Sequence, residues 1–347
     1  MRKFVQIKNN SGHTKLSCLR SRYGIHQREK KIHPVDISRP NGRVLLSGAS
    51  GLLGSALRQA LAVQNQPALQ LVRGPSESPD QMQWDPAAST VIGNSQPLES
   101  LTAAIHLSGA NVAAHRWTPA YKREMTESRL QSTHALAATL ARLRHPPQSL
   151  LVASAIGIYG NRAGQLLDET CSPGSGFLAD LCQQWEAAAT PAVEAGIRVV
   201  HLRFGVVIGP PGKSNPGALA RMLPIFRLGL GGPLGSGSQW MSWISLQDAV
   251  SAILFLGQTP AISGPVNLTA PNPVTNAQFT RALARALHRP AILPAPAAAL
   301  RLAFGEMADE ALLASARAYP TKLITAGFRF AHSTFERALA TALAQVQ

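Results

Sequence analysis

The sequence has little cysteine and little charge for its length. Its 347 residues include three cysteines, Cys18, Cys171 and Cys182, and charged residues make up 15%. The cysteines form no C-x-x-C pair, so a disulfide framework is not expected. This usage fits a reducing compartment, and we expect a cytoplasmic protein.

Long apolar runs and metal-ligand spacings are also missing. No apolar run reaches the ~18 residues that a membrane-spanning helix requires. The nearest candidate, at 291–304, contains two prolines and Arg301. The histidines show no H-x-x-x-H or other ligand spacing. We therefore expect no membrane span and no metal, while 45% hydrophobic residues indicate a globular chain.

Positive charge is concentrated at the start of the chain. The formal net charge is +15, and residues 1–43 carry eleven Lys and Arg against Glu29 and Asp36. Residues 1–41 show no hydrophobic periodicity, and without interleaved aromatics they do not favour nucleic-acid binding. A membrane-surface arm or a targeting peptide stays open, but we expect a disordered basic leader.

From residue 42 onward, apolar strands alternate with helical patterns. Strands are predicted at 43–48, 68–74, 103–109, 149–155 and 197–209, and helices include 119–143 and 178–195. Such alternation favours an α/β fold, a Rossmann-type doubly wound parallel sheet with helices on both faces. The predicted domains are the leader at 1–41, a nucleotide-binding domain at 42–210 with returning elements near 238–270, and a smaller substrate-side lobe at 211–347.

A glycine-rich loop follows the first predicted strand and opens a helix. Its spacing is G-x-x-G-x-x-G, at Gly48, Gly51 and Gly54. The first glycine permits the tight turn, the second lets the backbone approach a pyrophosphate, and the third lets the helix pack on the sheet. The helix N-terminus adds free N–H groups. We predict dinucleotide contacts from the loop at Gly48, Ser50, Gly51, Leu52, Leu53 and Gly54.

The end of the second predicted strand indicates which dinucleotide is bound. NAD-binding proteins place a carboxylate there, which bonds the ribose 2′-hydroxyl. This chain has Val72 and Arg73 instead, with no acidic residue before Glu77. A guanidinium suits the 2′-phosphate of NADP(H). We therefore predict NADP(H) as the cofactor, with Val72 and Arg73 among its contacts; a solvated surface Arg is the alternative.

Several further stretches resemble one family. The loop spacing is typical of the extended short-chain dehydrogenase/reductase superfamily. Its atypical nucleoside-diphosphate-sugar epimerase-like family, which carries a C-terminal domain of unknown function, is similar to this chain over about 42–345. The stretches that carry the resemblance are "AIHLSGANV", "RWTPAYKREMTESRLQST", "LRFGVVIGPPG", the glycine-rich block around 229–237 and the tail from "PVNLTAPNPV" onward.

The resemblance implies further cofactor contacts. By family position these are Leu107, Ser108, Gly109, Glu124, Arg129 and Val207. Taken alone, each would have a plainer explanation: Arg129 would be a solvated helix residue, and small residues at strand ends are common in tight turns.

The family's catalytic pattern is not complete in this chain. Extended members use a Tyr as general acid/base and a Lys four residues later that lowers its pKa. None of the four tyrosines is followed by such a Lys, and Phe177 and Leu181 stand roughly at the two positions. We keep Ser154 and Tyr159 as the substitute catalytic candidates, although Tyr159 is more often a packing residue in this motif.

Two classes of function follow. The first is an NADP(H)-dependent oxidoreductase or sugar-nucleotide epimerase-like enzyme acting on a small molecule. The second is a catalytically weak NADPH-binding regulator or scaffold, which the resemblance links to cell division. A homodimer is left open.

Overall fold

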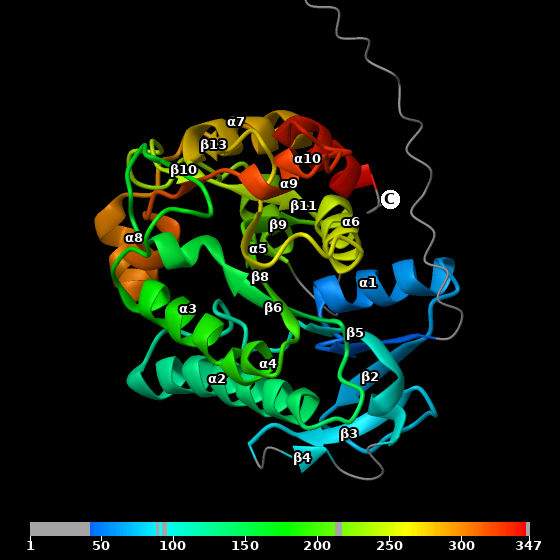
Figure 1. Ribbon diagram of the computed structural model, residues 1–347. Coiled ribbons are helices and arrows are strands. Elements are labelled where there is room, and N and C mark those ends of the chain that lie inside the picture. Colours follow the sequence, from blue (N-terminus) through cyan, green and yellow to red (C-terminus); the bar gives the residue numbers. More distant parts are fainter. Residues whose placement is uncertain (1–41, 88–89, 92–95, 212–216, 345–347) are drawn as a thin grey trace, which may run out of the picture. The chain divides into compact units, whose positions relative to one another are not determined.

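The central element is a twisted sheet of parallel strands (Figure 1). The computed structural model describes residues 42–87, 90–91, 96–211 and 217–344, and the predicted leader lies outside them. Within those residues the sheet order is β12-β8-β6-β5-β1-β2-β3, with β4 antiparallel at the β3 edge. The strands are β1 (Arg43–Ser47), β2 (Ala68–Val72), β3 (Gln81–Asp85), β4 (Thr90–Val91), β5 (Leu101–His106), β6 (Ser149–Ala155), β8 (Arg198–Phe204) and β12 (Gly264–Leu268).

Helices cover both faces of this sheet, as the sequence predicts (Figure 1). On one face α1 (Leu52–Val63) and α6 (Leu246–Gly257) share an apolar core with the strands. On the other face the same is true of α2 (Pro119–Ala141), α3 (Phe177–Ala187) and α4 (Thr190–Glu194). The fold class is therefore confirmed as Rossmann-type α/β, and the strand order reverses at β1, where ligands bind in such sheets.

The C-terminal elements gather around a separate apolar core. Its centre is aromatic: the ring centroids of Phe279 and Phe335 lie 4.6 Å apart, and those of Trp243 and Phe335 lie 5.3 Å apart. The remaining elements of the described residues are two 3-10 helices (Gln96–Ser100 and Ile156–Tyr159), β7 (Leu166–Leu167), β9 (Val206–Ile208), α5 (Ala218–Arg227), β10 (Trp240–Met241), β11 (Trp243–Ser245), β13 (Val274–Thr275), α7 (Asn276–Leu287), α8 (Ala297–Phe304), the π-helical turn Ala308–Leu312, β14 (Arg317–Ala318), α9 (Thr321–Thr325) and α10 (Phe335–Ala344).

Two predicted elements are each divided in the structure. The strand predicted at 197–209 becomes β8 and β9, and β9 pairs with β11 in a sheet of its own. The break is at Gly205, where a Cβ atom would lie 2.6 Å from the Ser242 carbonyl oxygen. The helix predicted at 178–195 becomes α3 and α4. The domain boundary at residue 210 stays a prediction. After this residue, α6 packs on the central sheet and β12 joins it.

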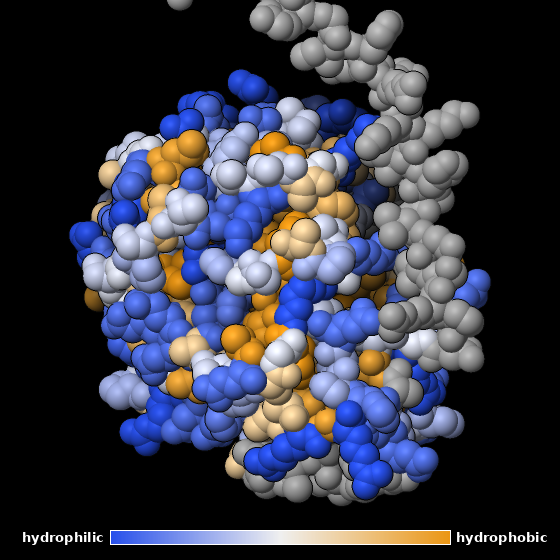
Figure 2. Space-filling view, viewed as in Figure 1, coloured by the Kyte–Doolittle hydropathy of each residue, from blue (hydrophilic) through white to orange (hydrophobic). Residues whose placement is uncertain are grey.

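No helix among the described residues is long and apolar enough to cross a membrane. The same residues contain no cluster of three His, Cys, Asp or Glu that could hold a metal ion. Cys171 and Cys182 are free thiols. The face in Figure 2 is largely hydrophilic, and a band of hydrophobic residues crosses its middle, over β6 and β8.

One buried histidine in the sheet should make stability depend on pH. His106 is fully buried between the hydroxyls of Ser47 (2.6 Å) and Ser132 (3.1 Å). Burial lowers its pKa from 6.5 to about 4. The unfolded chain then takes up a proton below about pH 6.5, whereas the folded chain does not. Stability contributed by the neutral ring is complete above that pH and is lost as the pH falls toward 4.

We expect this loss to reach about 3 kcal/mol. It is measured by urea unfolding of the parent and of His106→Gln at pH 7.5, 6, 5 and 4. The variant should be less stable at neutral pH but should show a flatter pH profile. His134→Gln, on the exposed side of α2, is the matched control and should follow the parent. Parallel pH profiles for the parent and His106→Gln would contradict the prediction.

Candidate functional site

The turn between β1 and α1 has the geometry of a phosphate-binding loop. Gly48 adopts φ +70°, and a Cβ there would lie within 3.0 Å of the backbone of Leu107 and Ser108. The Gly51 N–H donates to the Gly48 carbonyl at 3.0 Å, which closes the turn. Helix α1 then begins without a side-chain cap or an acidic residue in its first turn. Its N-terminal N–H groups and positive dipole end are thus suited to an anion.

The other two glycines of the loop have different roles. A Cβ on Gly54 would overlap the Gly48 carbonyl oxygen, because α1 packs directly on the loop. A Cβ on Gly51 would meet only that oxygen, at 3.4 Å, which is an ordinary contact. Gly51 lines an open cleft, so no other part of the described chain occupies the space beside its Cα atom. The predicted packing role of the third glycine fits this geometry.

A cleft of about 1010 Å³ opens beside the loop, at the carboxyl ends of β1, β2 and β5. This is the crevice where the strand order reverses, and it is where dinucleotides bind in such folds. Of the predicted cofactor residues, those that line it are Gly48, Ser50, Gly51, Val72, Arg73, Leu107, Ser108, Gly109 and Glu124.

Five predicted contacts lie elsewhere: Leu52, Leu53, Gly54, Arg129 and Val207 do not line the cleft. Leu53 and Val207 pack against the apolar core beneath α1. Arg129 is buried and donates to the carbonyl oxygens of Ala110 at 2.9 Å and Met125 at 3.0 Å. It thereby links the loop after β5 to helix α2.

The far end of the cleft is basic and polar. Arg73, directly after β2, is exposed, and Arg58 of α1 lines the same cleft, as do Gln70 and Gln81. Glu124 is the one carboxylate among the residues that line this cleft. Sequence reasoning missed Arg58, because it lies outside the glycine motif and resembles any exposed helical arginine.

Phe177 and Leu181, which by the resemblance stand roughly where a Tyr and a Lys are expected, are both apolar. Phe177 begins α3 and packs edge-on against Trp117, with 5.3 Å between ring centroids. The Lys122 ammonium lies over the Phe177 ring at 4.3 Å. Leu181, one turn along α3, is buried. Neither Phe177 nor Leu181 can exchange a proton, so the missing pair is not rebuilt at this place.

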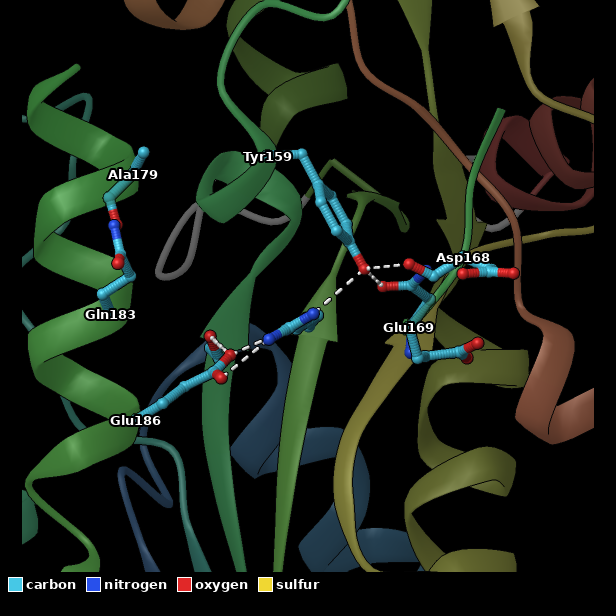
Figure 3. Close-up of polar contacts among 9 residues, drawn as sticks. Tyr159, Asp168, Glu169, Ala179, Gln183 and Glu186 are labelled. Atoms are coloured by element: carbon cyan, nitrogen blue, oxygen red, sulfur yellow. Dashed lines mark hydrogen bonds and ion pairs between the residues drawn. The ribbon is translucent and has the colours of Figure 1, made fainter. Parts of the chain in front are cut away.

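Glu186 lies in an ion-pair network (Figure 3), to which the buried Ser154 belongs. The Ser154 hydroxyl donates to Glu186 Oε1 at 2.7 Å, and Arg203 holds the same carboxylate through two N–H groups at 2.8 and 2.9 Å. Burial raises the pKa of Glu186, but the hydrogen bonds and charge of Arg203 outweigh it and keep the pKa below its ordinary value. The Ser154 hydroxyl is therefore committed to an ionised carboxylate.

Tyr159 belongs to the same network and is fully buried. Its hydroxyl donates to Asn267 Oδ1 at 2.8 Å, lies 3.0 Å from the Asp168 carbonyl oxygen and accepts from Arg203 at 3.1 Å. Figure 3 shows the ring directed toward Asp168. Burial raises the pKa of this phenol despite the neighbouring guanidinium. The placement favours the packing alternative for Tyr159 over the catalytic one.

Comparison with known proteins identifies the family. The sequence profile of the NAD dependent epimerase/dehydratase family matches residues 44–268, and that of a domain of unknown function, DUF1731, matches residues 295–342. An epimerase family protein of Mycobacterium bovis is 46% identical over 299 residues, which are 86% of this chain and 97% of that protein.

Solved structures are similar over the same range. The crystal structure of human epimerase family protein SDR39U1 with NADPH has a TM-score of 0.78 and 31% identity, over 87% of this chain and 99% of that one. UDP-N-acetylglucosamine 4-epimerase from Bacillus cereus has a TM-score of 0.69 at 14% identity, over 88% of this chain and 96% of that one, and shares the fold. The resemblance read from the sequence is confirmed.

The loop geometry makes opposite predictions for two of its glycines. Gly51→Ala should fold with a melting temperature close to that of the parent, because its backbone is extended (φ −73°, ψ 173°) and the Cβ has room. The new methyl group should nevertheless weaken NADPH binding at least about tenfold by displacing the pyrophosphate from the backbone. Gly54→Ala should destabilise the fold by about 1–3 kcal/mol or more, as overpacking does.

Differential scanning calorimetry and fluorescence titration with NADPH separate the two effects. A large stability loss in Gly51→Ala, or unchanged stability in Gly54→Ala, would show that the roles of these glycines are misassigned.

Proposed function

This chain belongs to the NAD dependent epimerase/dehydratase family, and we propose that it binds NADP(H) in the cleft and transfers hydride to or from a small, nucleotide-sugar-like substrate. The observation that carries the proposal is the pairing of the glycine loop with Arg73 at the end of β2. A carboxylate at that point would favour NAD, and none lines that end of the cleft.

The described residues fit a dinucleotide at each part of the cleft. The turn Gly48–Gly51 and the start of α1 would hold the pyrophosphate, and Arg73 would hold the 2′-phosphate. Ser108 and Gly109 line the same cleft, and the Ser108 backbone lies beside Gly48 of the loop. When bound, the nicotinamide supplies the hydride acceptor or donor. The human relative solved with NADPH supports the same choice of cofactor.

A second candidate function is an NADPH-binding regulator or scaffold with little or no turnover. The specific observation in its favour is the apolar pair Phe177 and Leu181, together with the burial of Ser154 and Tyr159 in one network. General acid/base groups contribute about 10²–10⁴-fold to rates. Without them, hydride transfer is expected to be slow on sugar nucleotides. Cofactor binding does not depend on these groups.

The preference for NADPH should depend on Arg73. The parent should bind NADPH at least several-fold more tightly than NADH, measured by fluorescence or calorimetric titration. Arg73→Glu should erase or reverse this preference, since the new carboxylate repels the 2′-phosphate and can accept from a 2′-hydroxyl. Equal affinity of the parent for both dinucleotides would remove the basis for NADP(H).

The buried network should affect stability more than turnover. Tyr159→Phe and Ser154→Ala each remove a hydrogen bond to a charged or buried partner and should lose about 1–3 kcal/mol of unfolding free energy. NADPH oxidation is followed spectroscopically with a panel of carbonyl compounds and sugar nucleotides. Rates per folded molecule should stay within about twofold of the parent. A loss of turnover beyond about 100-fold, with normal NADPH affinity, would make Tyr159 catalytic after all.

The same assay separates the two candidate functions. Turnover of any carbonyl or sugar nucleotide by the parent supports the oxidoreductase. Tight NADPH binding without turnover across the panel supports the regulator.

A further inference from the structure

A second guanidinium lies at the basic end of the cleft. Arg58, in the second turn of α1, lines the cleft together with Arg73. Side chains of a helix lean toward its N-terminus, which directs Arg58 back toward the end of β2. Arg58 is hydrogen-bonded to Gln70 of β2, and Arg73 directly follows that strand, so the two arginines reach the part of the cleft along β2 from a helix and from a strand end.

Arg58 is oriented by a neutral partner. Its Nη1 donates to Gln70 Oε1 at 3.3 Å, and Gln70 is the middle residue of β2, itself lining the cleft. This hydrogen bond holds the guanidinium over β2 without neutralising its charge.

Neither guanidinium is neutralised within the described part of the chain. No ion pair forms between Arg58 or Arg73 and the described acidic residues. The nearest acidic residues in sequence to Arg73 are Glu77, which does not line the cleft, and Asp80, which pairs with Arg43 at 3.0 Å. Two positive charges are thus left facing one end of a cleft.

The charge of the ligand group suits this pair. A phosphate monoester carries about −1.5 to −2 charges near neutral pH, and its three free oxygens accept several charge-assisted hydrogen bonds. One exposed arginine balances only part of that charge. A ribose hydroxyl, by contrast, gains little from either guanidinium.

From this geometry we propose that Arg58 is a second determinant of NADP(H) specificity, that it binds the 2′-phosphate jointly with Arg73, and that Gln70 positions it. The inference rests on the proposed binding of NADP(H) in this cleft and adds a residue that neither the glycine motif nor the end of β2 identifies. Because both arginines are exposed, their contribution falls as salt screens the site.

The test measures the affinity of the parent and of Arg58 variants for NADPH, NADH and 2′,5′-ADP by calorimetry. Arg58→Gln should weaken NADPH and 2′,5′-ADP about tenfold and leave NADH unchanged. Arg58→Lys should fall between the two, because it keeps the charge but loses the planar fork. Gln70→Leu should reduce the NADPH-to-NADH preference by a smaller factor. If Gln70 had a purely structural role, its loss would not change this preference.

Arg281→Gln is the matched control. It removes one exposed helical arginine from α7, which does not line the cleft, and should leave every affinity unchanged. The inference is overturned if Arg58→Gln weakens NADPH and NADH equally or keeps the full preference of the parent. A parent that prefers NADPH while Arg58→Gln keeps the whole of that preference refutes the role of Arg58 alone. A parent that binds neither dinucleotide refutes the proposed function as well.

Discussion

The contact between two backbone segments at the start of α1 is the constraint on which the site depends. Gly54 lies so close to the Gly48 carbonyl that no side chain fits between them. This closeness lets α1 start directly at the turn and sets its N-terminus at the crevice where the strand order reverses. The left-handed Gly48 and the loop after β5 meet at the same point. Helix, loop and cleft are therefore placed by one packing requirement.

On the other side of the sheet, a charge pair limits what the polar side chains can do. Arg203 is buried and its partner Glu186 is largely so, and a buried carboxylate or guanidinium without its partner is strongly destabilising. Ser154 and Tyr159 complete the hydrogen bonds of that pair. A hydroxyl that satisfies a buried charge cannot leave it to serve a substrate without exposing that charge. The network thus explains how these two side chains can be required by the fold without taking part in proton transfer.

Much of the sheet and the cleft could be predicted from local sequence, since β1, β2, β5 and β6 are short apolar runs that end near small or turn-forming residues. The break at Gly205 could not be, because it depends on the backbone of Ser242, which is distant in the sequence. The same reason applies to the site. The glycine loop and Arg73 are local signals, whereas the burial of Tyr159 depends on Asn267 and Arg203, which come from other strands.

The two halves of the site therefore differ in kind. At the glycine loop and the end of β2 the walls are open and polar, and their unpaired charges suit a phosphorylated ligand. Around Phe177 the chain is closed by the C-terminal domain: Glu306 pairs with Lys122 at 2.8 Å, Met307 joins the apolar cluster of Trp117, and Glu310 accepts the Leu178 N–H at 3.1 Å. That last contact caps α3, which has no side-chain cap of its own. The C-terminal domain thus stabilises α3, the helix that bears Phe177 and Leu181, and the packing of these two side chains becomes part of the fold. The phosphate-binding end of the cleft is not constrained in this way. Recognition of a dinucleotide and transfer of a proton are thus separable here, because different residues, held by different contacts, would perform them.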